Sequence, residues 1–151
     1  ALGTTTLPND LASRDIFLVA MASGDGAYRW AKGIGGAGDD LSMALTSSPA
    51  GVFLTGQFRG VVDFGGGSPL SAPGQFGAIF LAAYSPANGA HRWSKAFGLA
   101  ADPNVEEAGR GVAVGPFGHV MVTGDFANIV NLGGAPLDAT GTDTFLGMFV
   151  P

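Results

Sequence analysis

Short apolar segments alternate with clusters of glycine, proline, asparagine and aspartate along the whole chain. Residues 16–21 and 52–58 are rich in β-branched and aromatic side chains, and residues 42–46 alternate between polar and apolar positions. Such segments predict β-strands, as does the aromatic segment 27–34. The clusters between them have the composition of tight turns, because glycine, asparagine and aspartate tolerate positive φ angles. The strongest helical candidate, residues 106–113, is interrupted by two glycines, so we expect no helix.

The segment AYRWAKGIG at residues 27–35 recurs as AHRWSKAFG at residues 90–98, which places both tryptophans of the chain in equivalent positions. An ungapped alignment of residues 16–35 with 79–98 gives ten identities in twenty positions. A second block, GVFLTGQFRGVVDFGG, recurs 68 residues later as HVMVTGDFANIVNLGG. The chain therefore contains an internal repeat of 63–68 residues, and a further partial copy ends in TFLGMFV.

Each repeat contains four predicted strands, which is enough for one small antiparallel sheet. Small sheets bury both faces when they stack on neighbouring sheets, as the blades of a β-propeller do. The sequence therefore predicts an all-β fold of four-stranded antiparallel β-propeller blades. We expect a partial blade in residues 1–35, a complete blade in 42–97 and a further partial blade in 110–151. This is an incomplete ring of a little over two blades.

The strings DIFLVAM, AYRWAKGIGGAGDD and GVFLTGQFRGVVDFGG resemble the SBBP repeats, a family of seven-bladed β-propeller repeats in large secreted or surface proteins of bacteria. The resemblance covers almost the entire chain. It implies a propeller fold and a secreted or cell-surface location, and the family supplies no general catalytic residues to transfer. The second copy departs from the pattern, since GLAADPNVEEAG stands where the first copy has GGAGDD. The resemblance therefore assigns no role to paired aspartates in the second copy.

The order of the strands within a blade follows by resemblance to other propellers: residues 42–46 and 111–115 are innermost, 52–58 second, 16–21 third and 28–34 at the outer edge. A chain with this content cannot close a ring alone. It is either a piece of a longer propeller, with neighbouring blades in the same chain, or one of several subunits that build a ring. The first alternative is favoured, because residues 144–150 and 16–22 are both third strands and would compete for one position in a head-to-tail ring.

On this topology the short turns lie on one face of the blades, and the longer connections lie on the other: 36–41, 59–77, 99–109 and 127–143. Insertions in repeat proteins gather on one face, which often binds a partner. The candidate binding residues on this long-loop face are all charged: Asp39, Asp40, Asp102, Glu106, Glu107 and Arg110. Another protein subunit or a glycan is the expected kind of partner.

Asp39, Asp40 and Asp102 carry hard oxygen ligands of the kind that hold Ca²⁺. Ca²⁺ takes about six to eight oxygens, and the chain has no loop with the EF-hand pattern. A solvated acidic loop, or an aspartate that caps backbone amides in a turn, is therefore the favoured interpretation of these residues. We predict no required cofactor, with Ca²⁺ as the alternative.

Trp30 and Trp93 are each followed two residues later by a lysine on the same side of the strand. A sugar-binding platform is one interpretation, but recurrence at a framework position favours packing between blades, with the lysine stem along the indole. His91 and His119 lie outside the repeated framework, on the short-turn side and away from the acidic loops. Because the chain also has no nucleophile elbow and no phosphate-binding loop, we predict that it is not an enzyme.

Composition narrows the classes of partner. The 151 residues are 46% hydrophobic, which is ample for a core, and 12 acidic against 7 basic residues give a net charge of −5 that would repel nucleic acid. No apolar run approaches the roughly 20 residues of a membrane helix, no segment has the pattern of a signal peptide, and cysteine is absent. The sequence favours a non-catalytic scaffold or protein-interaction module, with a glycan- or Ca²⁺-binding module acting through the long-loop face as the alternative.

Overall fold

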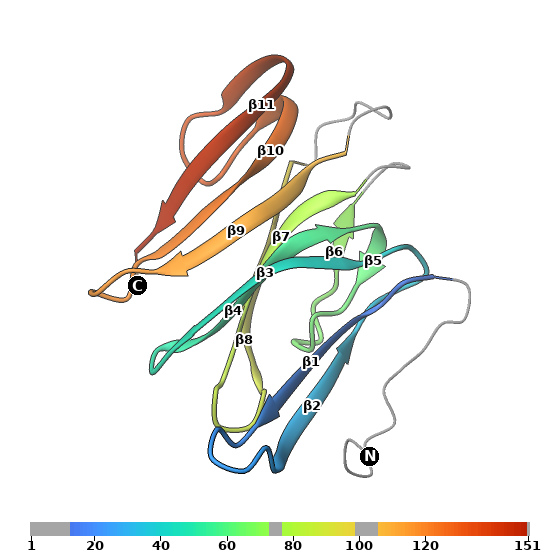
Figure 1. Cartoon of the computed structure of the whole chain (residues 1–151). Coiled ribbons are helices and arrows are strands. Elements are labelled where there is room, and N and C mark those ends of the chain that lie inside the picture. Colours follow the sequence, from blue (N-terminus) through green and yellow to red (C-terminus); the bar gives the residue numbers. More distant parts are fainter. Residues whose placement is uncertain (1–12, 73–76, 99–105, 151) are drawn as a thin grey trace.

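A computed structural model describes residues 13–72, 77–98 and 106–150, and this part of the chain consists of strands and turns without a helix (Figure 1). The strands are β1 (Ile16–Met21), β2 (Tyr28–Ile34), β3 (Leu41–Ser48), β4 (Gly51–Phe58), β5 (Gly60–Val62), β6 (Leu70–Ala72), β7 (Ala78–Tyr84), β8 (His91–Phe97), β9 (Ala108–Val114), β10 (Val120–Val130) and β11 (Leu137–Phe149). The predicted all-β class is confirmed.

The strands form three main antiparallel sheets, with orders β1-β2, β3-β4-β7-β8 and β11-β10-β9. This is the grouping that the repeat predicts: two strands, then four, then three. The second sheet begins at Leu41 and the third at Ala108, one and two residues earlier than expected. The equivalent strands β3 and β9 also share a β-bulge at the same repeat position, after Ser42 and after Gly109. The repeat therefore extends to details of strand pairing.

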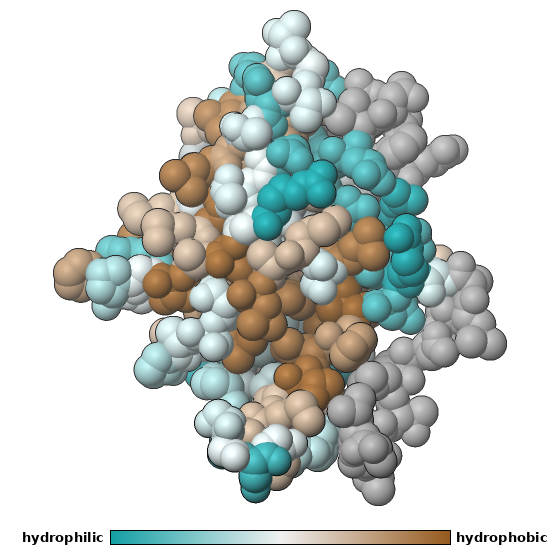
Figure 2. All heavy atoms as spheres, viewed as in Figure 1, coloured by the Kyte–Doolittle hydropathy of each residue, from teal (hydrophilic) through white to brown (hydrophobic). Residues whose placement is uncertain are grey.

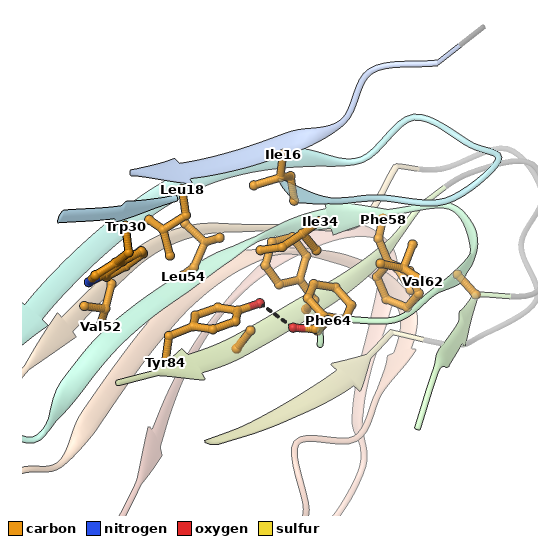
Figure 3. Packing of buried hydrophobic residues seen from close by; sticks show 14 residues of the cluster. Ile16, Leu18, Trp30, Ile34, Val52, Leu54, Phe58, Val62, Phe64 and Tyr84 are labelled. Atoms are coloured by element: carbon orange, nitrogen blue, oxygen red, sulfur yellow. Dashed lines mark hydrogen bonds between the residues drawn. The ribbon is translucent and has the colours of Figure 1, made fainter. Parts of the chain in front are cut away.

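The second sheet packs between the other two, and β7 shows this most directly because all of its residues are buried. Its residues Phe80, Ala82 and Tyr84 face the first sheet, where they join a core that includes Leu18 and Trp30 (Figure 3). The alternate residues of β7 face the third sheet and belong to a separate core: Ile79, Leu81 and Ala83. Period-two alternation in one strand thus seals two interfaces.

The connection 59–77 is not the long surface loop that the sequence predicts. It contains the antiparallel pair β5-β6, and Phe64 enters the first core, where its carbonyl accepts a hydrogen bond from Tyr84 Oη at 3.1 Å (Figure 3). Burial raises the pKa of the Tyr84 phenol. The connection 127–143 is likewise shorter than expected, because β10 continues to Val130 and β11 begins at Leu137. Both connections therefore contain strand residues that the sequence analysis does not predict.

The two outer sheets of the stack each expose an apolar face. Phe17 and Met21 of β1 point away from the second sheet and are 65% and 55% exposed, and we call them the first end face. Leu146 and Met148 of β11 point away on the opposite side, 74% and 62% exposed, and form the last end face. Apolar side chains are also visible around β3 and β1 in Figure 2.

The repeat shows that these end faces correspond to buried positions of the central sheet. Phe17 is equivalent to Phe80 and Leu146 to Leu81, and both central residues are 0% exposed. Each sheet therefore presents the phenylalanine side of its third strand to the preceding sheet and the leucine side to the following one. The stack has one direction throughout.

Candidate functional site

Asp39 and Asp40 lie directly before β3, and their side chains have different partners. The buried Asp40 carboxylate accepts hydrogen bonds from the backbone N–H groups of Gly36 (2.8 Å) and Arg59 (3.1 Å). The Asp39 oxygens accept bonds from the backbone N–H and the guanidinium of Arg14. Burial raises the pKa of Asp40 to about 6, whereas the hydrogen bonds from Arg14 lower the pKa of Asp39. The prediction of an aspartate that caps backbone amides is confirmed at Asp40.

Glu106 and Glu107 occupy the same two positions before β9. Glu107 is buried, and its Oε1 accepts a hydrogen bond from the Ala127 N–H at 3.2 Å, the repeat equivalent of the bond from Arg59 to Asp40. Its Oε2 has no hydrogen-bond partner among the described residues, and burial raises the pKa of this carboxyl to about 7. The second copy therefore keeps a buried carboxyl that accepts a backbone N–H, although its loop sequence departs from GGAGDD. Counting residues back from β9 pairs Glu106-Glu107 with Asp39-Asp40.

Three ion pairs lie near this end of the sheets: Arg14–Asp39 at 2.6 Å, Arg59–Glu106 at 2.9 Å and Arg110–Asp125 at 2.7 Å. The Arg59–Glu106 pair joins the end of β4 to the start of β9 and so connects two sheets. Sequence reasoning missed Arg59 because Ala127 stands at the equivalent position, which removes any repeated signal. Of the predicted binding residues, Asp102 lies outside the described residues, and the others contact neighbours within the fold.

The oxygens of Asp39 and Asp40 face N–H donors, which is the arrangement of a cap and an ion pair. In residues 13–72, 77–98 and 106–150 no three His, Cys, Asp or Glu side chains gather in the manner of a metal site. The same residues contain no helix with the length and apolarity needed to span a membrane. The acidic residues at this end therefore have structural partners in the fold itself.

Trp30 packs between the first two sheets, as predicted. Its side chain is 9% exposed, and Nε1 donates a hydrogen bond to the Pro86 carbonyl at 3.2 Å. Pro86 belongs to the turn between β7 and β8, and Gly89 of the same turn lies on the indole. Gly89 has φ +68°, and a Cβ there would lie 2.6 Å from the ring, so this position requires glycine. The turn of one sheet thus covers the tryptophan of the sheet before it.

Trp93 is less covered than Trp30. It contacts Phe53 with ring centroids 6.1 Å apart and lines a groove of about 340 Å³ between the second and third sheets. The groove walls are mostly apolar and come from both sheets: Ala50, Phe53, Trp93, Lys95, Gly118, Val120, Phe149 and Val150. Sequence reasoning paired both tryptophans with blade packing but gave no reason for the difference between them.

His91 has an acidic neighbour that lies outside the two acidic loops. The folded connection 59–77 brings Asp63 near it, and the ring contacts Tyr84 edge-on with centroids 5.9 Å apart. Burial lowers the pKa of His91, and Lys32 adds to this effect. The Asp63 carboxylate accepts its hydrogen bonds from three successive glycine N–H groups, which orders the turn. His119 lies in a different place, against Phe117 beside the β9–β10 turn.

Comparison with protein-family models gives no match, and comparison with curated proteins gives no significant one. The function is therefore argued from the geometry.

Replacing Glu107 with glutamine is expected to stabilise the protein by about 1–3 kcal/mol at pH 8 and to change little at pH 5. The pKa of Glu107 is raised from 4.5 to about 7, so its contribution to stability is present below pH 4.5 and is lost as pH rises through about 7. Glutamine keeps the acceptor for the Ala127 N–H and removes the charge. Urea unfolding at both pH values measures the effect.

The neighbouring substitution Glu106→Gln is the matched control, because this side chain lies at the surface and pairs with Arg59. It should leave the pH dependence of stability as in the wild type. An equal flattening by both substitutions would contradict a specific role for the buried carboxyl.

Proposed function

We propose that this chain is a run of β-propeller blades that serves as a non-catalytic scaffold or protein-interaction module of a secreted or cell-surface protein. Its neighbours are further blades of a longer chain or other protein subunits that stack on the two end faces. The observation that carries the proposal is the directional stack, in which the end faces present positions that the central sheet buries completely.

The arrangement of the inner strands also supports the proposal. The edge strands β3 and β9 lie side by side (Figure 1), and β9 also contacts β4 of the second sheet. Inner strands that approach one another are what blades around a common axis require. The strand order from inner to outer edge is the same in the second and third sheets, as a repeated blade requires.

The first sheet, which has two strands in the described residues, fits the same picture. The sheet β1-β2 corresponds to the third and fourth strands of a blade, since β1 aligns with β7 and β2 with β8. The inner half of that blade would pair with the edge of β1 at which no described strand lies. A protein of this kind binds its neighbours by pairing strands at sheet edges and by packing apolar sheet faces together.

Self-association tests the proposal. Exposed end faces should make the chain associate as its concentration rises, and Phe17→Lys and Leu146→Lys should each weaken that association by placing a charge on an apolar face. Sedimentation velocity over a concentration series measures the effect. The control is Phe117→Lys, which changes an aromatic residue that is 79% exposed in the β9–β10 turn, off both end faces. Association that depends on Phe117 but not on Phe17 or Leu146 would contradict the proposal.

A further inference from the structure

Two features at the end of the stack, the free edge of β11 and the groove beside Trp93, have filled counterparts in the central sheet. There β7 pairs with β4 on one edge and with β8 on the other. β11, which aligns with β7, pairs with β10, and within the described residues no strand pairs with its second edge. Among the described residues, the third sheet has no counterpart of β8.

The groove corresponds to a position that a turn fills at the first interface. There the Pro86 carbonyl of the β7–β8 turn accepts a hydrogen bond from the Trp30 N–H, and Gly89 of the same turn lies on the indole. Trp93 is the repeat equivalent of Trp30, and the groove lies on it at the corresponding place. Val150 follows β11, lines the groove and aligns with Ser85, the residue before Pro86. The groove therefore has the position and the apolar lining of a binding site for a proline-containing turn.

We propose that the groove at Trp93 and the free edge of β11 together bind one polypeptide segment: a proline-containing turn followed by an extended strand with the sequence pattern of β2 and β8. This inference rests on the proposed function and names the segment that the last sheet takes. The turn carbonyl accepts the Trp93 N–H, and the strand pairs antiparallel with β11. This is strand addition to a sheet edge, in which backbone bonds give affinity and side chains give register.

The register follows from the two complete pairs. The tryptophan of β2 lies opposite Ala20, and the tryptophan of β8 lies opposite Ala83. The equivalent position of β11 is Met148, so the tryptophan of the bound strand lies beside Met148 on the last end face. The bound strand therefore also covers part of an exposed apolar surface.

A second copy of this chain is a poor occupant of the site. Its β2 already pairs with its own β1, which is a third strand like β11, so two third strands would compete for one position. The groove walls also argue against a glycan, because Lys95 is the one charged residue among the eight that line it. The geometry fits a polypeptide turn and strand.

The experiment uses the full chain and a fluorescein-labelled synthetic peptide of residues 86–98, PANGAHRWSKAFG, which carries the turn and strand of the central sheet and starts after the position that Val150 occupies. Fluorescence anisotropy should show saturable binding with one peptide per chain. Trp93→Phe in the chain removes the indole N–H and should weaken binding about five- to tenfold, the loss expected for one hydrogen bond. A peptide with Gly89→Val should bind at least about tenfold more weakly, because its side chain would meet the indole.

Two controls separate binding from folding. Circular dichroism should show that Trp93→Phe leaves the thermal unfolding midpoint within about 2 °C of the wild type, because phenylalanine keeps an aromatic ring in the groove. A scrambled peptide should not bind. Absence of binding by the native peptide, or binding that Trp93→Phe and Gly89→Val leave unchanged, would overturn the inference. Self-association through Phe17 and Leu146 is measured without the peptide. A negative peptide-binding result therefore does not decide the proposed function, which the self-association experiment tests separately.

Discussion

Replacing Leu81 with alanine is expected to lower the free energy of unfolding by about 2–5 kcal/mol, whereas the same substitution at Leu146 should change it by less than about 0.5 kcal/mol. The two leucines occupy one position of the repeat, in β7 and in β11. Leu81 is 0% exposed in the core between the second and third sheets, and Leu146 is 74% exposed on the last end face. Truncation of Leu81 leaves a cavity in the core, whereas water fills the space of the truncated Leu146 side chain.

Urea unfolding of both variants at one pH measures the difference, and the matched chemistry makes Leu146→Ala its own control. The result would also test the direction of the stack, because only the leucine side of each sheet faces the following sheet. Phe80→Ala and Phe17→Ala form the corresponding pair on the other side, with 0% and 65% exposure. Equal losses at Leu81 and Leu146 would mean that the last end face is covered in solution by another part of the protein or by a second copy.

The grouping of strands into sheets could be predicted because the repeat carries it. Equivalent strands of the repeat are rich in apolar residues, which favour burial of one or both faces of the strand. The tryptophan segments mark the fourth strand in each copy. A hydrogen bond within each sheet shows how far the repeat extends: Thr55 Oγ1 donates to the Phe80 carbonyl, and Thr123 Oγ1 donates to the Phe145 carbonyl. Local sequence and tertiary pairing agree at these positions, which is the condition under which pattern reasoning succeeds.

The folding of the connection 59–77 could not be predicted in the same way. Its strands β5 and β6 are three residues each, too short for a periodic signal, and they are held by packing of Val62, Phe64 and Ala72 into the first core. That packing depends on the space left beside the two-stranded first sheet. This segment brings Asp63 close to His91, and the strand topology alone does not predict that proximity.

The sequence identifies the acidic residues that precede β3, but it does not predict what each carboxylate does. Asp39 and Asp40 are adjacent and chemically alike, and sequence cannot say which one the fold buries. The structure buries Asp40 under the backbone N–H groups of Gly36 and Arg59 and leaves Asp39 to Arg14. The difference arises from the start of β3, where successive side chains point to opposite sides.

Replacing Asp40 with alanine is expected to lower the free energy of unfolding by about 2–4 kcal/mol at pH 5. Two backbone N–H groups lose their acceptor, and each unsatisfied buried donor costs about 1–3 kcal/mol. The loss should be smaller at pH 8, because burial raises the pKa of Asp40 from 3.8 to about 6. Its contribution is fully present below pH 3.8 and is lost as pH rises through about 6. Urea unfolding at both pH values measures the change.

The neighbouring substitution Asp39→Ala is the control, and it should have little effect, since its partner Arg14 is at the surface and returns to water. Any small effect should fade in high salt, whereas the loss at Asp40 should persist because that carboxylate is buried. Equal, small losses at both positions would contradict the capping role and leave the Asp40 oxygens available to a ligand. A rise in Tm with Ca²⁺ that EDTA reverses and Asp40→Ala abolishes would then identify that ligand, and it would mean that this end of the sheets binds a cation.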